Sequence, residues 1–181
     1  IYPLKLGLIF MTGITVSWGL RLLIPTVSKI FTLELGEANT KLAMTLFFVV
    51  LGLAALPAGK IASQLGNSLG MIIGGCGTVV VLLTLLVLPD GLIKIIAIAL
   101  LVFLFSLILN GAVPFALSLV PQSRGGLGVG MYFGGFGGGI SLFDFLGAKL
   151  SNSSLEMGAI AGSIAFLAAL LCIAIASKIN Y

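Results

Sequence analysis

The sequence has few charges and no histidine. Charged residues make up 8% of the 181 residues and hydrophobic residues 60%, whereas a soluble domain carries roughly a quarter charged residues. So few charges cannot cover a water-soluble surface. The absence of histidine excludes a histidine metal site, a histidine proton relay and a catalytic triad. The two cysteines, Cys76 and Cys172, lie far apart in apolar blocks, and we interpret them as small buried hydrophobic residues.

The apolar residues that remain fall in long blocks. They follow neither the period of a strand nor that of an amphipathic helix, and blocks of about 18 or more apolar residues are typical of membrane-spanning helices. The net charge of +4 is small and scattered along the chain, which argues against a nucleic-acid partner. We therefore expect an integral, multi-pass membrane protein in contact with lipid, without a cofactor or metal. We also expect residues to precede Ile1 in the natural protein.

Breaks between the apolar blocks divide the chain into six expected helices. The loop signals are the charged stretch after the first helix, Pro89-Asp90-Gly91, Pro121 to Gly126, and Ser151 to Ser154. The whole chain, residues 1–181, is then one transmembrane domain. The expected helices cover residues 4–31, 42–58, 69–88, 93–120, 127–146 and 155–177.

An even number of spans places both ends of the chain on one side of the membrane. Lys5, Lys60, Arg124 and Lys178 belong to that side, and most acidic residues belong to the other. Each side carries four basic residues, so the acidic residues of the other side make the side of the termini the more positive one. We therefore expect the side of the termini to be cytoplasmic.

Polar groups inside the membrane are costly, so their positions are informative. On the first helix Ser17, Trp18 and Arg21 share one face by their spacing, and on the fourth helix Ser106 and Asn110 do the same. These two helices are expected to line a cavity. The third and sixth helices carry few polar groups, so we expect them at the periphery.

Two charges within apolar blocks each allow more than one interpretation. Arg21 either extends to the interface or lies in a cavity, where it pairs with a carboxylate or binds a polar solute. Asp144 is the only acid within an apolar block. It is a proton- or sodium-coupling carboxylate, a partner of Arg21, or an interfacial residue paired with Lys149.

Residues 125–139 are rich in glycine and also contain Tyr132 and Phe136. Small residues allow membrane helices to approach closely, so tight packing of the fifth helix is expected. Tyr132 and Phe136, one turn apart, either stack on a sugar ring or belong to the packing. A phosphate-binding loop is excluded because no Gly-Lys-Ser/Thr ending is present.

Two loops resemble those of a known transporter family. The stretch from Leu56 to Ser68 resembles the loop motif G-x-x-x-D-R-x-G-R-[RK] of the major facilitator superfamily, with Gly59 and Gly66 at matching positions. The stretch from Asn110 to Tyr132 is similar to the sugar–cation symporter branches of that superfamily. The resemblance implies that Gly59, Lys60, Gly66 and Arg124 belong to gating loops.

The resemblance also implies a fold and a function. Such transporters consist of two six-helix halves, each built from two inverted three-helix repeats. This chain then corresponds to the C-terminal half, its partner being a missing N-terminal half. It would move a small polar solute, sugar-like in kind, by alternating access coupled to an ion. The cavity residues would be Ser17, Trp18, Arg21, Ser106, Asn110, Tyr132 and Phe136, and Asp144 would be the ion-coupling residue.

The alternative is a non-transporting membrane subunit, derived from a transporter and packed in a larger complex. An enzyme is not expected, because the sequence shows no cluster of metal ligands, nucleophile–base pair or carboxylate pair.

Overall fold

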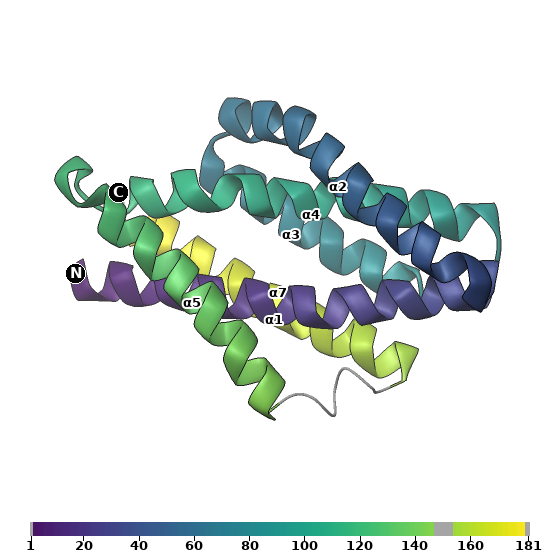
Figure 1. Cartoon of the computed structure of the whole chain (residues 1–181). Coiled ribbons are helices and arrows are strands. Elements are labelled where there is room, and N and C mark those ends of the chain that lie inside the picture. Colours follow the sequence, from purple (N-terminus) through teal and green to yellow (C-terminus); the bar gives the residue numbers. More distant parts are fainter. Residues whose placement is uncertain (1, 147–153, 180–181) are drawn as a thin grey trace.

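The computed structural model describes residues 2–146 and 154–179, except for the side chain of Asn67. This part of the chain forms six α-helices and one short 3₁₀ helix (Figure 1). The expectation of an all-helical chain with six helices is therefore confirmed. The elements are α1 (Tyr2–Leu35), α2 (Glu37–Leu65), α3 (Asn67–Thr84), α4 (Leu92–Ser118), η1 (Gln122–Arg124), α5 (Gly125–Leu146) and α7 (Leu155–Ile179).

Four of these helices, α1, α2, α4 and α7, are long and apolar enough to cross a membrane. The apolar part of α3, Ser68–Thr84, is shorter. Helix α5 has 22 residues, but its many glycines contribute little hydrophobicity. Large hydrophobic side chains are exposed on all six helices, as expected for a surface that faces lipid.

The turns occur where glycine permits them. Gly36, Gly66 and Gly91 adopt positive φ angles of 80°, 89° and 111°, a region that other residues rarely enter. The expected end of the second helix at residue 58 is wrong, because α2 continues through Pro57 to Leu65. Figure 1 shows that α2 is bent: its last turns stand off the bundle and run in a different direction from the part before them, in keeping with a proline inside a helix.

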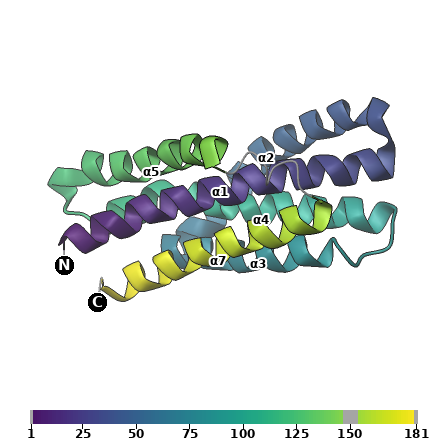
Figure 2. The ribbon, with the colours of Figure 1, turned by 90° about the horizontal axis from the view of Figure 1, so that it is seen from below.

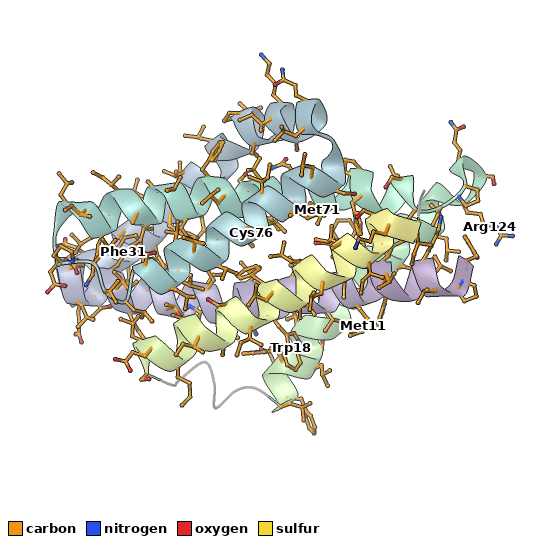
Figure 3. All side chains as sticks on the ribbon, turned by 180° about the vertical axis from the view of Figure 1, so that it is seen from behind. Met11, Trp18, Phe31, Met71, Cys76 and Arg124 are labelled. Atoms are coloured by element: carbon orange, nitrogen blue, oxygen red, sulfur yellow. The ribbon has the colours of Figure 1, made fainter. Side chains whose placement is uncertain are left out.

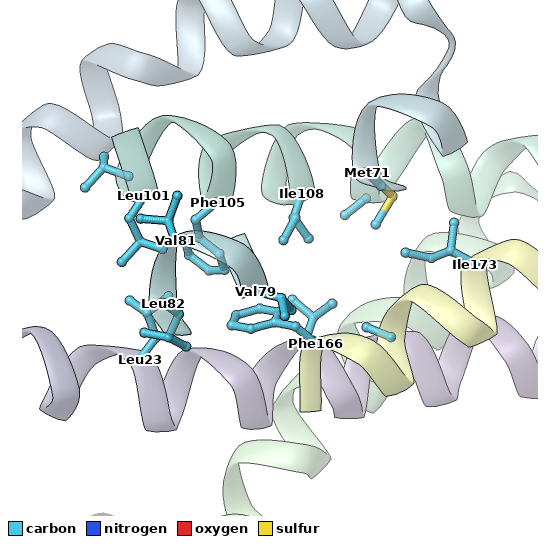
Figure 4. Close-up of a cluster of buried hydrophobic side chains, with 14 of the residues drawn as sticks. Leu23, Met71, Val79, Val81, Leu82, Leu101, Phe105, Ile108, Phe166 and Ile173 are labelled. Atoms are coloured by element: carbon cyan, nitrogen blue, oxygen red, sulfur yellow. The ribbon is translucent and has the colours of Figure 1, made fainter. Parts of the chain in front are cut away.

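The core lies between α1, α3, α4 and α7. Figure 4 shows its side chains, among them Leu23, Leu82, Phe105 and Phe166, one from each of these helices. Phe105 and Phe166 meet edge to face with ring centroids 5.8 Å apart. Four helices thus share one apolar core, and α2 and α5 pack on its outside.

The expectation that the third and sixth helices are peripheral is wrong for this chain. In its most apolar stretch α2 is only 11% buried, compared with 44% for α1 and 39% for both α4 and α7. The reason is glycine: Gly74 of α3 lies so close to α4 that an added Cβ would be 2.6 Å from the Leu104 carbonyl oxygen. We inferred a peripheral position from the scarcity of polar groups on α3 and α7, but helices with few polar groups can still pack closely against their neighbours.

The helices alternate in direction, and the N- and C-terminal ends lie at the same end of the bundle (Figures 1 and 2). The turns after α2 and α4 therefore point toward the end that holds Tyr2, and the turns after α1 and α3 point toward the other end. We call the first of these the basic end, because it carries Lys5, Lys60, Arg124 and Lys178 and none of the five acidic side chains.

This topology predicts a labelling pattern. In a background with Cys76 and Cys172 replaced by alanine, single Lys60→Cys and Arg124→Cys variants should react with an impermeant maleimide from one side of the membrane. Asp90→Cys should react from the other side, because Asp90 precedes α4 and Arg124 follows it, so one helix that can cross the membrane separates the two positions. Labelling of Lys60→Cys and Asp90→Cys from the same side would contradict the arrangement.

Candidate functional site

Arg21 and Asp144 form an ion pair between α1 and α5. The Arg21 Nη2 atom donates a hydrogen bond to Asp144 Oδ1. The two side chains are 41% and 51% exposed, so the pair lies open at the surface of this six-helix bundle. Of the alternatives for Asp144, the structure shows the pairing with Arg21; Lys149 lies outside the described residues.

The position of Arg21 along α1 argues against a simple reach to the end of that helix. Fourteen residues separate Arg21 from the end of α1 at Leu35, or about 21 Å at 1.5 Å per residue. An arginine side chain covers only part of that distance. Its Nε atom is buried and has no hydrogen-bond partner in the described part of the chain.

Trp18 holds the two helices in register beside the ion pair. Its Nε1 atom donates a hydrogen bond to the Gly139 carbonyl oxygen over 2.9 Å, and its ring meets Phe143 edge to face at 5.6 Å. On α1, Trp18 lies about one turn before Arg21, and on α5, Phe143 directly precedes Asp144. Trp18 is labelled in Figure 3. The aromatic contact and the ion pair thus occupy the same stretch of the α1–α5 interface.

Small residues bring the backbones of α1 and α5 together. Gly13 and Ser17 of α1 face Gly135 and Gly139 of α5, and each pair is spaced four residues apart. A Cβ on Gly139 would lie 2.9 Å from Ile14 Cα, and one on Gly135 would overlap the Phe10 carbonyl. Ser17 is fully buried here and bonds to the Ile14 carbonyl oxygen over 2.7 Å. Ser17 therefore packs at the interface and does not line an open surface.

The polar pair of α4 lies beside α2. Asn110 Nδ2 donates to the Ser106 carbonyl oxygen over 2.8 Å and lies 3.1 Å from Ser106 Oγ. Its Oδ1 atom would be 3.7 Å from a Cβ on Gly59 of α2. Ser106 is buried, and Asn110 is half-buried. The structure therefore brings Trp18, Arg21 and Asp144 together, and it places Ser106 and Asn110 at a separate contact.

Tyr132 and Phe136 of α5 both take part in packing, to different extents. Tyr132 is 2% exposed, and its ring stacks with that of Phe136 at a centroid distance of 6.3 Å. Its carbonyl oxygen lies so close to Gly13 of α1 that it would overlap a Cβ atom added there. Tyr132 thus takes the packing role, and Phe136 is half-buried next to it.

The expected gating residues do not share one loop. Gly59 and Lys60 lie within α2, and only Gly66 forms the turn to α3. Arg124 ends the 3₁₀ helix before α5, with its guanidinium carbon 5.3 Å from the centroid of the Tyr2 ring. The resemblance of residues 56–68 to a loop motif predicted a loop here, but α2 continues through Pro57 to Leu65.

A second charged cluster, at the end opposite the basic end, was not foreseen. Lys94 Nζ lies 3.1 Å from Glu34 Oε1 and 2.5 Å from Asp90 Oδ1, and the Gly91 N–H donates to Glu34 Oε2 over 2.7 Å. The side chains of Glu34 and Lys94 are only 5% and 11% exposed. The hydrogen bond and charge of Lys94 lower the pKa of Asp90.

This cluster ties the end of α1 to the start of α4. The Glu34 carboxylate satisfies one of the free N–H groups at the α4 N-terminus and complements its dipole. The i, i+4 spacing of Asp90 and Lys94 was readable from the sequence, but no sequence signal connects Glu34 to a turn more than fifty residues away.

No group of three or more cysteine or acidic side chains that could hold a metal ion occurs in residues 2–146 and 154–179. Comparison of the chain with protein families, with curated proteins and with solved structures finds no match.

Proposed function

We propose that this chain is an integral membrane protein and one six-helix half of a secondary transporter of the major facilitator type. In this proposal it moves a small polar, sugar-like solute by alternating access coupled to an ion. The observation that carries the proposal is the Arg21–Asp144 pair, half-exposed near the middle of the longest helix. Ionisable groups within membrane-spanning helices are costly and commonly mark solute or ion pathways.

The pattern of helix packing supports two inverted repeats. Helix α1 packs against α7 and α5, and α4 packs against α3 and α2. If α1, α2 and α3 are exchanged with α4, α5 and α7, in that order, the α1–α7 and α1–α5 contacts become the α4–α3 and α4–α2 contacts. The α3–α7 contact becomes itself. The α2–α3 contact has no equal among the described residues. Helices α1 and α4 run in opposite directions (Figure 1), which is what a two-fold axis in the membrane plane between the two halves requires.

The ion pair suggests how solute and ion are coupled. Asp144 needs a positive charge beside it, and Arg21 supplies that charge when no solute is bound. A solute that engages the guanidinium competes with Asp144, and a proton or a sodium ion then replaces Arg21 at the carboxylate. The two ligands favour each other's binding by this linkage. Separation of the pair also removes one link between α1 and α5.

Solute-driven ion flux tests the proposal. The intact gene product, with any partner half, would be reconstituted in vesicles containing a pH-sensitive or a sodium-sensitive dye and exposed to a panel of sugars and polyols. We expect at least one solute to drive proton or sodium movement. Absence of flux with every solute, together with stable isolation in a larger membrane complex, would favour the non-transporting subunit.

A further inference from the structure

An apolar cavity lies beside the charged cluster that joins the end of α1 to the start of α4. Its volume is about 230 Å³, and α1, α2 and α4 all contribute to its lining. Leu35 of α1, which directly follows Glu34, lines this cavity. Ile95 of α4, which directly follows Lys94, lines it from the other side. Figure 3 labels a third lining residue, Phe31. The ion pair of Glu34 and Lys94 therefore joins two of the three helices that enclose the cavity.

The two carboxylates beside Lys94 belong to different parts of the fold. Asp90 lies four residues before Lys94, in the turn that leads into α4, and its side chain is 86% exposed. Lys94 Nζ donates a hydrogen bond to Asp90 Oδ1 over 2.5 Å. Glu34 belongs to α1, and its side chain is only 5% exposed. If the end of α1 separates from α4, Asp90 accompanies Lys94 and Glu34 does not.

The contact of Lys94 with Glu34 is the looser of the two. Glu34 Oε1 lies 3.1 Å from Lys94 Nζ, but it is buried and accepts no hydrogen bond in the part of the chain that the structure describes. One ammonium group thus serves two carboxylates that lie close together, and their negative charges repel each other. Removal of one partner from a buried ion pair is usually costly, because the other charge is left uncompensated. Here Asp90 remains as a partner for Lys94.

We propose that the Glu34–Lys94 contact is a strap that closes the cavity at this end, and that Asp90 makes the strap reversible. In the closed arrangement Lys94 contacts both carboxylates. In the open arrangement the end of α1 has moved away from α4, Lys94 pairs with Asp90 alone, and Glu34 is hydrated. Opening also relieves the repulsion between the two carboxylates. Water then reaches the apolar cavity. The strap is independent of transport, so its failure would leave the proposed function untouched.

The rate at which a cysteine in the cavity reacts tests the strap. Ala43 lines the cavity and is 9% exposed, so Ala43→Cys, with Cys76 and Cys172 replaced by alanine, reports opening. The intact protein in detergent, without solute, would be treated with a water-soluble methanethiosulfonate reagent. Glu34→Gln removes the charge that holds Lys94 to α1 and should accelerate labelling at least about tenfold, as expected for the loss of a bond to a charged group.

Asp90→Asn should have the opposite effect. Without the Asp90 charge, the closed arrangement loses the repulsion between the carboxylates, and the open arrangement leaves Lys94 without a charged partner. Exposed ion pairs contribute about 0.2–1 kcal/mol, so labelling should slow by roughly 1.5- to 5-fold. A mere loss of stability would instead accelerate labelling in both variants. Faster or unchanged labelling of Asp90→Asn would therefore overturn the strap.

A second reporter separates opening of the cavity from unfolding. Ala169 of α7 is 3% exposed in the core, so Ala169→Cys should label slowly and at the same rate in all three backgrounds. Acceleration at this position as large as that at Ala43→Cys would show that Glu34→Gln unfolds the bundle and would overturn the local opening. If Glu34→Gln does not fold at all, the slower labelling expected of Asp90→Asn decides. Complete protection of Ala43→Cys in the parent and in both variants would show a cavity that never opens.

Discussion

Replacing Arg21 by alanine is expected to abolish solute uptake while the protein still inserts into the membrane. Hydrogen bonds from a charged group contribute about 1.5–3 kcal/mol, which corresponds to roughly 10- to 150-fold in affinity. Loss of Arg21 removes this contribution and also leaves Asp144 without its positive partner. Uptake at equal expression, with surface labelling as the measure of insertion, checks the prediction.

Two further variants separate binding from folding in this experiment. The double variant Arg21→Ala/Asp144→Ala removes both charges, so it should insert and fold at least as well as the single variant and still show no uptake. Lys41→Ala, at an exposed position of α2, should transport at the parental rate. Uptake at the parental rate by Arg21→Ala would remove Arg21 from the site and leave it as a structural partner of Asp144.

Replacing Gly135 and Gly139 together by alanine is expected to force α1 and α5 apart. An added Cβ on Gly139 would overlap Ser17 Oγ and approach Ile14 Cα to 2.9 Å, and one on Gly135 would overlap the Phe10 carbonyl. Insertion of single methyl groups into tight packing costs about 1–3 kcal/mol each. The variant should lose thermal stability in detergent, and the fluorescence of Trp18 should change because its bond to Gly139 requires the close approach.

The same helix supplies a matched control. Gly134 and Gly138 have no atom within 4 Å of an added Cβ, and alanine favours helix over glycine by about 1 kcal/mol. Gly134→Ala/Gly138→Ala should therefore be at least as stable as the parent, although it adds the same two methyl groups. Equal stability of the two double variants would refute the proposed role of the Gly135–Gly139 face.

The sequence predicts the number of helices because long apolar blocks leave few alternatives. It misplaces some of their ends: the second helix was expected to end at residue 58, but the chain turns at Gly66, where the φ angle is positive. It also misjudges which helices are central. Gly70, Gly74 and Gly77 of α3 each lie against a neighbouring helix, and their spacing was available as a signal of close packing.

The candidate site was partly predictable because charged residues are rare in the apolar blocks. Arg21 and Asp144 are rare charges in apolar blocks, so a pairing between them was one of few possibilities. Ser17 was misjudged because spacing places a residue on a helix face without showing which neighbour covers that face. Glu34 and Lys94 each resembled an ordinary interfacial charge, and only the fold brings them to 3.1 Å.

The glycines of α5 also affect its stiffness. Nine of its 22 residues are glycine, and five of these, Gly126, Gly130, Gly134, Gly137 and Gly138, meet no atom within 4 Å of an added Cβ. Each lowers intrinsic helix propensity by about 1 kcal/mol relative to alanine without a compensating contact. Helix α5 is thus the most glycine-rich helix in the described part of the chain, and it carries Asp144. We expect its backbone to yield readily in a shape change that separates Asp144 from Arg21.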